Sequence, residues 1–484
     1  MAQHEPARAT SVAADSGQRF RFALLALVVL GALVRIGFAV AVAPDLPLPG
    51  DAKLYREMAG NLAAGRGLST VGVDIPDLQP SAEHPPLFPG VLAALDRVGL
   101  ADLREQRVSL AVVSAASVLL VGLLGRRLGG PAVGLVAGAI AALHPLWLQS
   151  AGLVMSESLH LVFVPAVLLV GLSVLERPSY RGAAALGGLI GAAALVRPEA
   201  LGLAVVVGVP ALLPARAPWP VRARLCAVLM ASCLLVITPW LVRNQRELGA
   251  VTMSTNAGKT LLGSNCDASY SGSGLGGFAY DCQFGAATVL VDYGPPDGGR
   301  WDGVSFDRAL GAVGRDFIDT HREQLPRVIL ARSLRMWGLA FAEDQLQFDV
   351  LEGRDATLQR VGQWVHLALV PPAIAGAVIL ARRTRRRAVL LLGPPALVTL
   401  TVVLIYGGTR MRVGAEPSIA VLSAIGLVSV GRWLEGRRGD EEPPRSRRRR
   451  APAVACPAYD QDRDPRRRLQ RGQHPGADSG SHPT

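Results

Sequence analysis

Long apolar runs, separated by short polar stretches, make up most of the chain. The first runs from Phe22 to about Val42, and about 20 apolar residues suffice to cross about 30 Å of hydrocarbon. Further runs follow at about 108–125, 131–148, 158–175, 182–196, 200–214, 225–241, 363–381, 388–406 and 417–433. Because lipid offers backbone groups no hydrogen-bond partner, each run must be helical. The pattern predicts an all-α integral membrane protein with about ten transmembrane helices.

Two of these runs leave a choice of interpretation. The first could be a signal peptide, but a cleaved signal has a shorter apolar core and a small-residue cleavage site. We therefore expect a retained first helix. The runs at 182–196 and 200–214 are short and flank Arg197-Pro198-Glu199, so together they could form one re-entrant or tilted hairpin.

Arginine clusters between the runs predict the orientation. They are Arg126-Arg127, then Arg177 and Arg181, then Arg216, Arg222 and Arg224, then five arginines within 382–387, and finally Arg437-Arg438. With ten spans, all of them fall on the side of the N-terminus. Cytoplasmic loops carry the excess of Lys and Arg, so both termini are expected in the cytoplasm. The expected location is the plasma membrane.

The polar segments complete the expected organisation. A cytoplasmic tail at 1–20 precedes a membrane domain at 21–433, and two long loops of that domain, at about 44–106 and 242–362, lie on the outer side. Residues 434–484 are rich in Arg and Pro, with Arg447 to Arg450 in a row. Such a tail is expected to be disordered, cytoplasmic and able to contact anionic lipid.

Composition and charge narrow the functional class. Hydrophobic residues make up 50% of the chain and charged residues 18%, against about 25% charged in soluble domains. A soluble enzyme is thereby excluded. The net charge of +12 lies mostly in the clusters beside the spans and in the tail. Nucleic-acid binding would require a contiguous basic face, so no nucleic-acid partner is predicted.

The five cysteines differ by location. Cys226 and Cys233 fall in an apolar run and are expected to be buried packing residues, while Cys456 is in the tail. Cys266 and Cys282 flank a loop rich in Gly, Ser and Tyr. If that loop is extracytoplasmic, a disulfide between them is the natural interpretation.

The ionisable residues of the first outer loop could have either a structural or a catalytic role. Asp51 follows Pro49-Gly50, where it could cap a helix or act as a general base on a hydroxyl. Glu83-His84 precedes a Pro-Pro pair. That rigid element is either a turn or a second carboxylate and an imidazole held over a site.

Later residues on the same predicted side also have two interpretations. Glu157, Arg197 and Glu199 could pair with one another, because ionisable groups at membrane depth are costly unless paired. Arg243, Arg410 and Arg412 could anchor their helices at the interface. Alternatively, these arginines bind a phosphate, for which the guanidinium fork is suited.

The common placement is more informative than any one residue. Seven residues fall on one membrane face: Asp51, Glu83, Glu157, Arg197, Arg243, Arg410 and Arg412. Carboxylates and arginines gathered at the outer leaflet are what sugar transfer from a lipid phosphate would require.

In this order, the residues resemble the GT-C superfamily, and more narrowly bacterial relatives of protein O-mannosyltransferases and of the aminoarabinose transferase of lipid A (family 39-like). The resemblance covers roughly residues 20–433 and suggests an actinobacterial type. Its motifs are Gly50-Asp51-Ala52-x-x-Tyr55, Glu83-His84-Pro85-Pro86-Leu87, Ser156-Glu157, Arg197-Pro198-Glu199, Thr238-Pro239-Trp240-x-x-Arg243-Asn244, Asn256-Ala257-Gly258-x-x-Leu261-Leu262-Gly263-Ser264-Asn265 and Arg410-Met411-Arg412-Val413-x-x-Glu416-Pro417.

The resemblance implies a GT-C bundle that transfers a sugar from a polyprenyl phosphate, with inversion, to a lipid, glycan or protein hydroxyl of the cell envelope. It implies catalytic roles for Asp51 (the base), Glu83 and His84, and substrate-binding roles for residues that follow: Tyr55, Glu157, Arg197, Glu199, Arg243, Arg410 and Arg412. Many protein O-mannosyltransferases carry Asp-Glu in the first loop, whereas Ala52 follows Asp51 here, which leaves a protein acceptor open to question.

Three alternatives remain. No cofactor is assigned, although paired carboxylates with a histidine could hold a divalent metal. A transporter or flippase of lipid-linked sugars is the main competing function, but transporters often show repeats and broken helices at mid-membrane. Here the ionisable residues lie at the outer helix ends, which favours the enzyme. A scaffolding protein would leave that placement unexplained.

Overall fold

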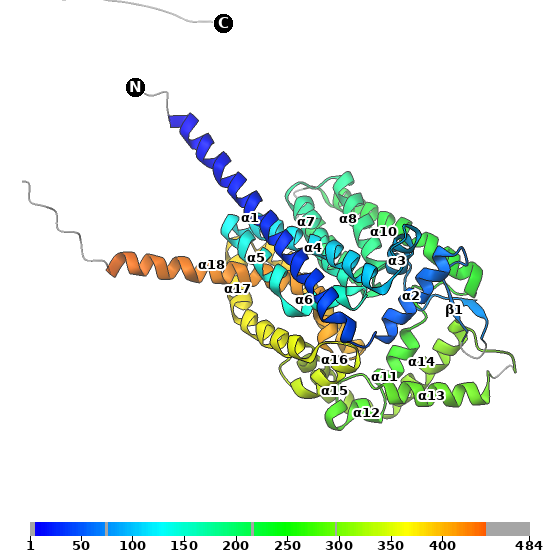
Figure 1. The fold of residues 1–484 in the computed structure, drawn as a ribbon. Helices are drawn as coiled ribbons and strands as arrows, with labels where there is room; N and C mark the ends of the chain where they lie inside the picture. The colour runs from blue at the N-terminus through cyan, green and yellow to red at the C-terminus, as the bar shows by residue number, and fades with distance from the viewer. Residues whose placement is uncertain (1–4, 73–75, 214–216, 296–297, 442–484) are drawn as a thin grey trace, which may run out of the picture. The chain divides into compact units, whose positions relative to one another are not determined.

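The computed structural model describes residues 5–72, 76–213, 217–295 and 298–441 (Figure 1). Residues 1–434 form one compact unit, while 435–484 form a second unit of which the structure describes only the end of the last helix. The predicted Arg-rich run at 447–450 and Cys456 lie outside the described residues. The predicted domain limits at residues 20 and 433 stay predictions.

The membrane region is a bundle of helices. Its elements are α1 (Glu5–Ala41), α4 (Leu103–Gly129), α5 (Pro131–Leu143), α6 (Pro145–Gly152), α7 (Glu157–Glu176), α8 (Tyr180–Ala194), the 3₁₀ turn η2 (Pro198–Gly202), the π turn η3 (Ala204–Gly208), α9 (Val209–Leu212), α10 (Trp219–Leu248), α17 (Ala356–Leu404) and α18 (Glu416–Glu441). α1 packs against α4 and α5, and α8 packs against α10 (Figure 1).

The described residues contain six helices long and apolar enough to cross a membrane. They confirm an all-helical, multi-pass membrane protein, while the number ten stays a prediction. α17 contains the predicted run 363–381 and all but the last two residues of the run 388–406, joined at Thr384, whose backbone is not helical. α8 ends just before Arg197-Pro198, and the chain continues as η2. A proline lacks the amide hydrogen that a helix interior needs, which explains the interruption there.

The first loop folds as η1 (Ala43–Asp45), α2 (Gly50–Ala63), the antiparallel strands β1 (Ser69–Val71) and β2 (Leu78–Pro80), and α3 (Leu87–Arg97). Its apolar side chains form a separate cluster around the buried Phe88 and Leu92, against Leu110 of α4 and Met155. The loop is thereby fixed to the end of the bundle, and Asp51 is held on a buried helix rather than on a free segment.

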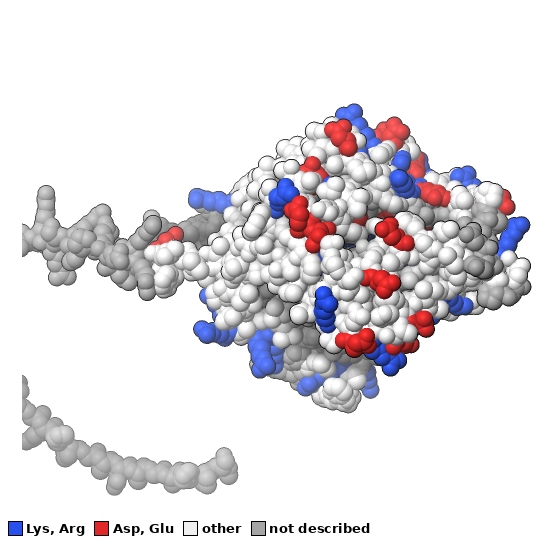
Figure 2. Space-filling model, turned by 90° about the horizontal axis from the view of Figure 1, so that it is seen from below, with Lys and Arg blue, Asp and Glu red and all other residues white. Residues whose placement is uncertain are grey.

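The second loop is also helical. It comprises α11 (Ala257–Ser264), α12 (Asp267–Tyr270), η4 (Gly272–Gly274), α13 (Tyr280–Tyr293), α14 (Gly303–Thr320), η5 (Arg322–Gln324), α15 (Leu325–Trp337) and α16 (Ala342–Leu351); η6 (Thr409–Gly414) joins α17 to α18. Cys266 and Cys282 form the predicted disulfide. On the face drawn in Figure 2, acidic and basic side chains are interspersed among uncharged surface.

Glycines bring α8 and α10 into backbone contact. A Cβ built on Gly187 would lie 2.0 Å from the Leu229 carbonyl oxygen, and one on Gly191 would lie 2.8 Å from the Cys233 oxygen. Close approach of backbones through small residues is how helices associate in lipid, where apolar burial gives no advantage. Gly188, by contrast, has only Val236 near, at 3.9 Å.

This packing predicts that Gly187→Val destabilises the bundle, because the new side chain must push α10 away. We expect a loss of about 1–3 kcal/mol of unfolding free energy, as for other overpacked sites. The measurement is thermal unfolding in detergent. The control is Gly188→Val, which changes the same residue type one position along the same helix; equal stability of both variants would contradict the prediction.

Candidate active site

The two loops meet over one end of the bundle. The Thr255 amide donates to the Ala82 carbonyl at 2.8 Å, and the Ser254 hydroxyl donates to the Glu83 carbonyl at 2.6 Å. The Glu83 carboxylate pairs with Lys259 at 2.6 Å. Glu83 therefore joins the first loop to the second, and its side chain faces Lys259 rather than Asp51.

Arg410 lies at the centre of the acidic residues. Its three guanidinium nitrogens face three carboxylates: Nη2 is 2.5 Å from Asp51 Oδ2, Nε is 2.5 Å from Glu157 Oε1, and Nη1 is 3.3 Å from Glu352 Oε1. Asp51 comes from α2, Glu157 from the start of α7, and Glu352 follows α16. One buried cation thus joins both loops to the bundle, at the point where three chain segments converge.

A glycine pair places Arg410 there. α17 ends at Leu404, and Gly407 then passes so close to α15 that a Cβ would lie 2.1 Å from the Arg332 carbonyl oxygen. The Gly407 amide donates to the Gly276 carbonyl at 2.8 Å. Because Gly407 has no side chain to clash with α15, the chain can turn inward there and place η6 beside the cluster.

Asp51 is not a helix cap. The N-cap of α2 is Pro49, and the Asp51 carboxylate is turned toward Arg410. Burial is the largest single effect and would raise the pKa of Asp51, but the charges of Arg410 and His84 and the hydrogen bond from Arg410 together hold that pKa below its ordinary value. The carboxylate is therefore ionised at neutral pH, and about a third of its side chain stays exposed, at 31%.

His84 and Tyr55 line the other side of Asp51. His84 Nε2 is 3.8 Å from Asp51 Oδ1, and the His84 ring packs on the Tyr55 ring with centroids 4.3 Å apart. Burial lowers the pKa of His84 despite the neighbouring carboxylates. The Tyr55 hydroxyl donates to Ser156 Oγ at 3.1 Å. The predicted Gly50-Asp51-x-x-x-Tyr55 segment and His84 are thus brought together.

Arg197 connects the interrupted hairpin to the same cluster. Its Nη1 lies 2.9 Å from Glu157 Oε1 and its Nε lies 2.5 Å from Glu199 Oε1. Glu157 therefore accepts from two arginines, Arg197 and Arg410. Both predicted pairings of Arg197 are present. Arg197 also lines a cavity, so an anionic ligand could compete with these carboxylates for its guanidinium.

A cavity of about 630 Å³ opens beside these groups. Its charged and polar lining residues are Asp51, Tyr55, His84, Ser156, Arg197, Glu199, Thr252, Ser254, Asn256, Thr260, Thr401, Tyr406 and Arg410. Val196, Leu261, Ile405 and Met411 add apolar walls. The cavity therefore offers both ionised groups and apolar surface, as a molecule with a charged head and an apolar chain requires.

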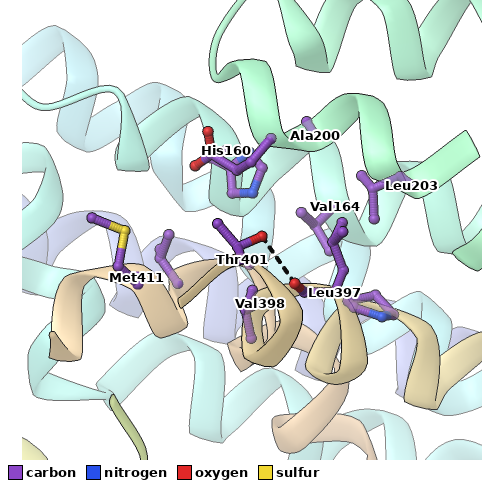
Figure 3. A pocket seen from close by; sticks show the side chains of 12 residues that line it. His160, Val164, Ala200, Leu203, Leu397, Val398, Thr401 and Met411 are labelled. Atoms are coloured by element: carbon purple, nitrogen blue, oxygen red, sulfur yellow. Dashed lines mark hydrogen bonds between the residues drawn. The ribbon is translucent and has the colours of Figure 1, made fainter. Parts of the chain in front are cut away.

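A small apolar recess adjoins this cavity and shares Glu199, Thr401 and Met411 with it. Figure 3 shows Leu397, Val398 and Thr401 of α17 on one side of the recess, and His160 with Ala200 on the opposite side. The Thr401 hydroxyl donates to the Leu397 carbonyl of its own helix at 2.9 Å, so it offers the recess little free polarity (Figure 3).

Two predicted arginines lie elsewhere. Arg243 donates to the Leu68 and Ser81 carbonyls at 2.7 and 2.9 Å, and so holds the base of the hairpin β1–β2. Arg412 is fully buried, with Nε 2.6 Å from Glu416 Oε1. Neither arginine lines the cavity, so neither is placed to contact a substrate there.

The hydrogen-bonded surroundings include residues that the sequence analysis did not single out. Glu352 is the clearest: its Oε1 accepts from Arg410 and from the Tyr280 hydroxyl at 3.2 Å. Burial raises the pKa of Glu352, with Arg410 opposing the rise. Ser156, Tyr280 and Lys259 also contact predicted residues. The motif Ser156-Glu157 in the sequence pointed to Ser156. Nothing in the sequence distinguished Glu352 from the other polar residues of its loop.

The carboxylates near Arg410 do not form a metal centre in this arrangement. Among the described residues no group of three or more His, Cys, Asp or Glu side chains is placed to hold a metal ion. Instead, Asp51, Glu157 and Glu352 direct their oxygens at the guanidinium.

Comparison with known proteins adds a family signal in one part of the chain. Residues 83–242 match the family of dolichyl-phosphate-mannose-protein mannosyltransferases. This segment holds Glu83, His84, Glu157, Arg197 and Glu199. No protein with a curated description matches the chain in sequence.

Solved structures resemble the whole bundle. The archaeal oligosaccharyltransferase AglB from Archaeoglobus fulgidus, in complex with an inhibitory peptide and a dolichol-phosphate, matches with a TM-score of 0.51 at 15% identity, over 86% of this chain and 51% of that one. Its apo form gives 0.51 at 14% identity, over 86% and 52%. ArnT from Cupriavidus metallidurans, bound to undecaprenyl phosphate, gives 0.40 at 16% identity, over 87% and 81%.

The chain spans about half the length of the archaeal enzyme that it matches, since 51% of that protein is covered. The family match at residues 83–242 and the structural matches over 86% of the chain concern the same helical bundle. The chain has the fold of the archaeal oligosaccharyltransferase AglB over the part of that enzyme that it matches.

Proposed function

We propose that this protein transfers a sugar from a polyprenyl phosphate to a hydroxyl group of a cell-envelope lipid, glycan or protein. The observation that carries the proposal is the cluster of Asp51 with Arg410 and Arg197 in one wall of an amphiphilic cavity. AglB and ArnT were solved with dolichol-phosphate and undecaprenyl phosphate respectively, which supports a lipid-phosphate donor. The active site would face the outer leaflet, with both termini in the cytoplasm.

The reaction is a single inverting displacement. Asp51 accepts the proton of the acceptor hydroxyl, whose oxygen forms the new bond to the anomeric carbon. The bond from that carbon to the phosphate oxygen breaks, and its electron pair leaves with the lipid phosphate. Arg197 and Arg410 stabilise the charge that grows on the phosphate, which is an electrostatic contribution of the oxyanion-hole type.

The contacts of Arg410 suggest how donor and base are linked. Arg410 is bonded to Asp51 Oδ2, one of the two carboxylate oxygens that could accept the proton. A donor phosphate competes for that guanidinium, because a phosphate is a strong charge-assisted acceptor. As Arg410 turns toward the phosphate, Asp51 loses an opposing charge and becomes a better base. The donor would thus activate the base on binding.

The apolar recess and the residues of α17 support an orientation for the donor. With the phosphate at the arginines, the polyprenyl chain would leave along Ile405, Met411 and the recess beside Leu397. The sugar would then lie toward Asp51 and Tyr55, below the second loop.

The first test replaces the base. Asp51→Asn keeps the side-chain size but removes the proton acceptor, and we expect the transfer rate to fall by about 10²–10⁴-fold. The assay follows radiolabelled sugar from a panel of polyprenyl-phosphate sugars to envelope acceptors in membranes with equal protein levels. The control is Asp45→Asn, an exposed aspartate of the same loop.

The outcomes separate the hypotheses. Loss of transfer in Asp51→Asn alone supports the proposal and identifies the donor. Equal rates in wild type and Asp51→Asn would overturn the role of Asp51 as base. Movement of a lipid-linked sugar across the bilayer, with no transfer from any donor, would support a flippase instead.

A second prediction concerns pH. Since Arg410 holds the pKa of Asp51 below its ordinary value, the base stays ionised as the pH falls, and kcat/KM for the donor should not decline above about pH 4 on this account. In Arg410→Gln, burial dominates and the pKa of Asp51 rises. The acid limb of the residual activity should move upward by about 1–3 pH units.

The matching control is Arg322→Gln, which removes an exposed arginine paired only on the surface with Asp319. Its profile should superimpose on the wild type. An acid limb in the same place for Arg410→Gln and wild type would show that Arg410 does not set the protonation of the base.

A further inference from the structure

A second cavity, of about 200 Å³, is lined by Thr409, the residue directly before Arg410. It is bounded by the end of α15, by α16 and by the first turns of α17. Its polar lining residues are Arg335, Glu343, Gln345, Asp349, Gln359, Arg360, Gln363 and Thr409. None of these residues belongs to the lining of the larger cavity. Thr409 is followed directly by Arg410, so adjacent residues of η6 line the two cavities.

A buried carboxylate held by neutral groups forms part of this lining. Asp349 is 1% exposed, and its oxygens accept from Gln345 Nε2 at 3.0 Å, Gln359 Nε2 at 2.5 Å and Thr409 Oγ1 at 2.7 Å. Burial raises the pKa of Asp349. A carboxylate whose side-chain hydrogen bonds come from amides and a hydroxyl is suited to accept from further hydroxyl groups, which neither add nor remove charge.

Side-chain amides dominate the rest of the polar lining. Gln363 donates through Nε2 to the Gly338 carbonyl at 3.0 Å, while its buried Oε1 has no hydrogen-bond partner among the described residues. Amides and hydroxyls both donate and accept, so such a lining can match the alternating donors and acceptors of a polyol. The lining charges also balance, with two arginines against two carboxylates. A neutral ligand therefore fits better than a phosphate.

The position in α17 indicates how a ligand would arrive. Trp364 and Leu367 line the cavity from the first turns of this membrane helix, and Trp364 is 68% exposed. Tryptophan at a helix end is typical of the boundary between lipid and water. A ring stacked on Trp364 could enter from that boundary while an attached chain stays in lipid. With about 200 Å³, the cavity is smaller than a drug-sized site and suits a single ring.

We propose that this second cavity binds the neutral, hydroxyl-bearing headgroup of the acceptor, a single sugar-like ring carried by a lipid or another membrane-anchored molecule. This assignment of the ligand as acceptor rests on the proposed function. Thr409 gives the ring a contact beside Arg410, and through Arg410 beside Asp51. Because Asp51 lines the larger cavity and not this one, the hydroxyl that reacts would extend from the bound ring past Thr409 toward Arg410.

The test measures sugar binding without requiring transfer. The full-length protein in phosphatidylcholine nanodiscs is titrated with methyl glucoside, methyl mannoside and methyl galactoside, and saturation-transfer NMR reports the bound sugar. A second arm uses nanodiscs that contain glucosyl diacylglycerol, with tryptophan fluorescence as readout. The variants are Trp364→Ala and Gln363→Leu. The control is Trp219→Ala, because Trp219 is 66% exposed at the start of α10, outside this cavity.

We expect both variants to weaken binding of at least one probe at least fivefold, with the control unchanged and all proteins equally stable to heat. Loss in the glycolipid arm alone identifies a lipid headgroup, and loss in the methyl-glycoside arm identifies free sugar recognition; both support the site. Wild-type affinity of both variants in both arms, or equal loss in Trp219→Ala, overturns it.

Kinetics then separate this inference from the proposed function. In the transfer assay, Trp364→Ala should raise the acceptor KM at least fivefold and leave the donor KM unchanged. If wild type binds sugar at this cavity but transfers none from any donor, the proposed function fails while the binding site stands. If the donor KM rises as much as the acceptor KM, the cavity does not select the acceptor.

Discussion

The structure depends on one buried cation. Arg410 is only 10% exposed, and charges at such a depth are stable only where partners replace the lost hydration. Three carboxylates do so, one from the first loop, one from the bundle and one from the second loop. Because each segment brings a carboxylate that pairs with Arg410, these ion pairs fix the loops and the bundle together.

The same constraint shapes the surroundings of the cluster. Gly407 allows the backbone just before η6 to pass close to α15, and Arg332 fixes that approach by donating to the Val403 carbonyl at 2.9 Å. Within the second loop, the disulfide between Cys266 and Cys282 ties the start of α13 to the start of α12. Tyr280, two residues before Cys282, bonds to Glu352. The disulfide and the close approach at Gly407 therefore both constrain the segments around Arg410 and its carboxylate partners.

Deeper in the bundle, a second charged group follows the same rule. Arg412 pairs with Glu416, whose oxygens also lie 3.8 Å from His144 and 3.5 Å from His366. These groups come from α18, η6, α17 and the junction of α5 with α6. Two residues of one short motif, Arg410 and Arg412, thus point to opposite sides of η6: one to a cavity, the other into the helix packing.

The sequence by itself determined the membrane fold, the disulfide and the gathering of Asp51, Tyr55, His84, Glu157, Arg197, Glu199 and Arg410 at one end. These follow from local properties, since hydropathy fixes the spans and the spans fix which residues share a face. Only the tertiary structure decided the partners. Asp51 and Arg410 are 359 residues apart, and no local pattern tells whether Arg243 meets a cavity or the carbonyls of a hairpin. Glu352 joined the site because of how α16 packs, which depends on contacts far along the chain.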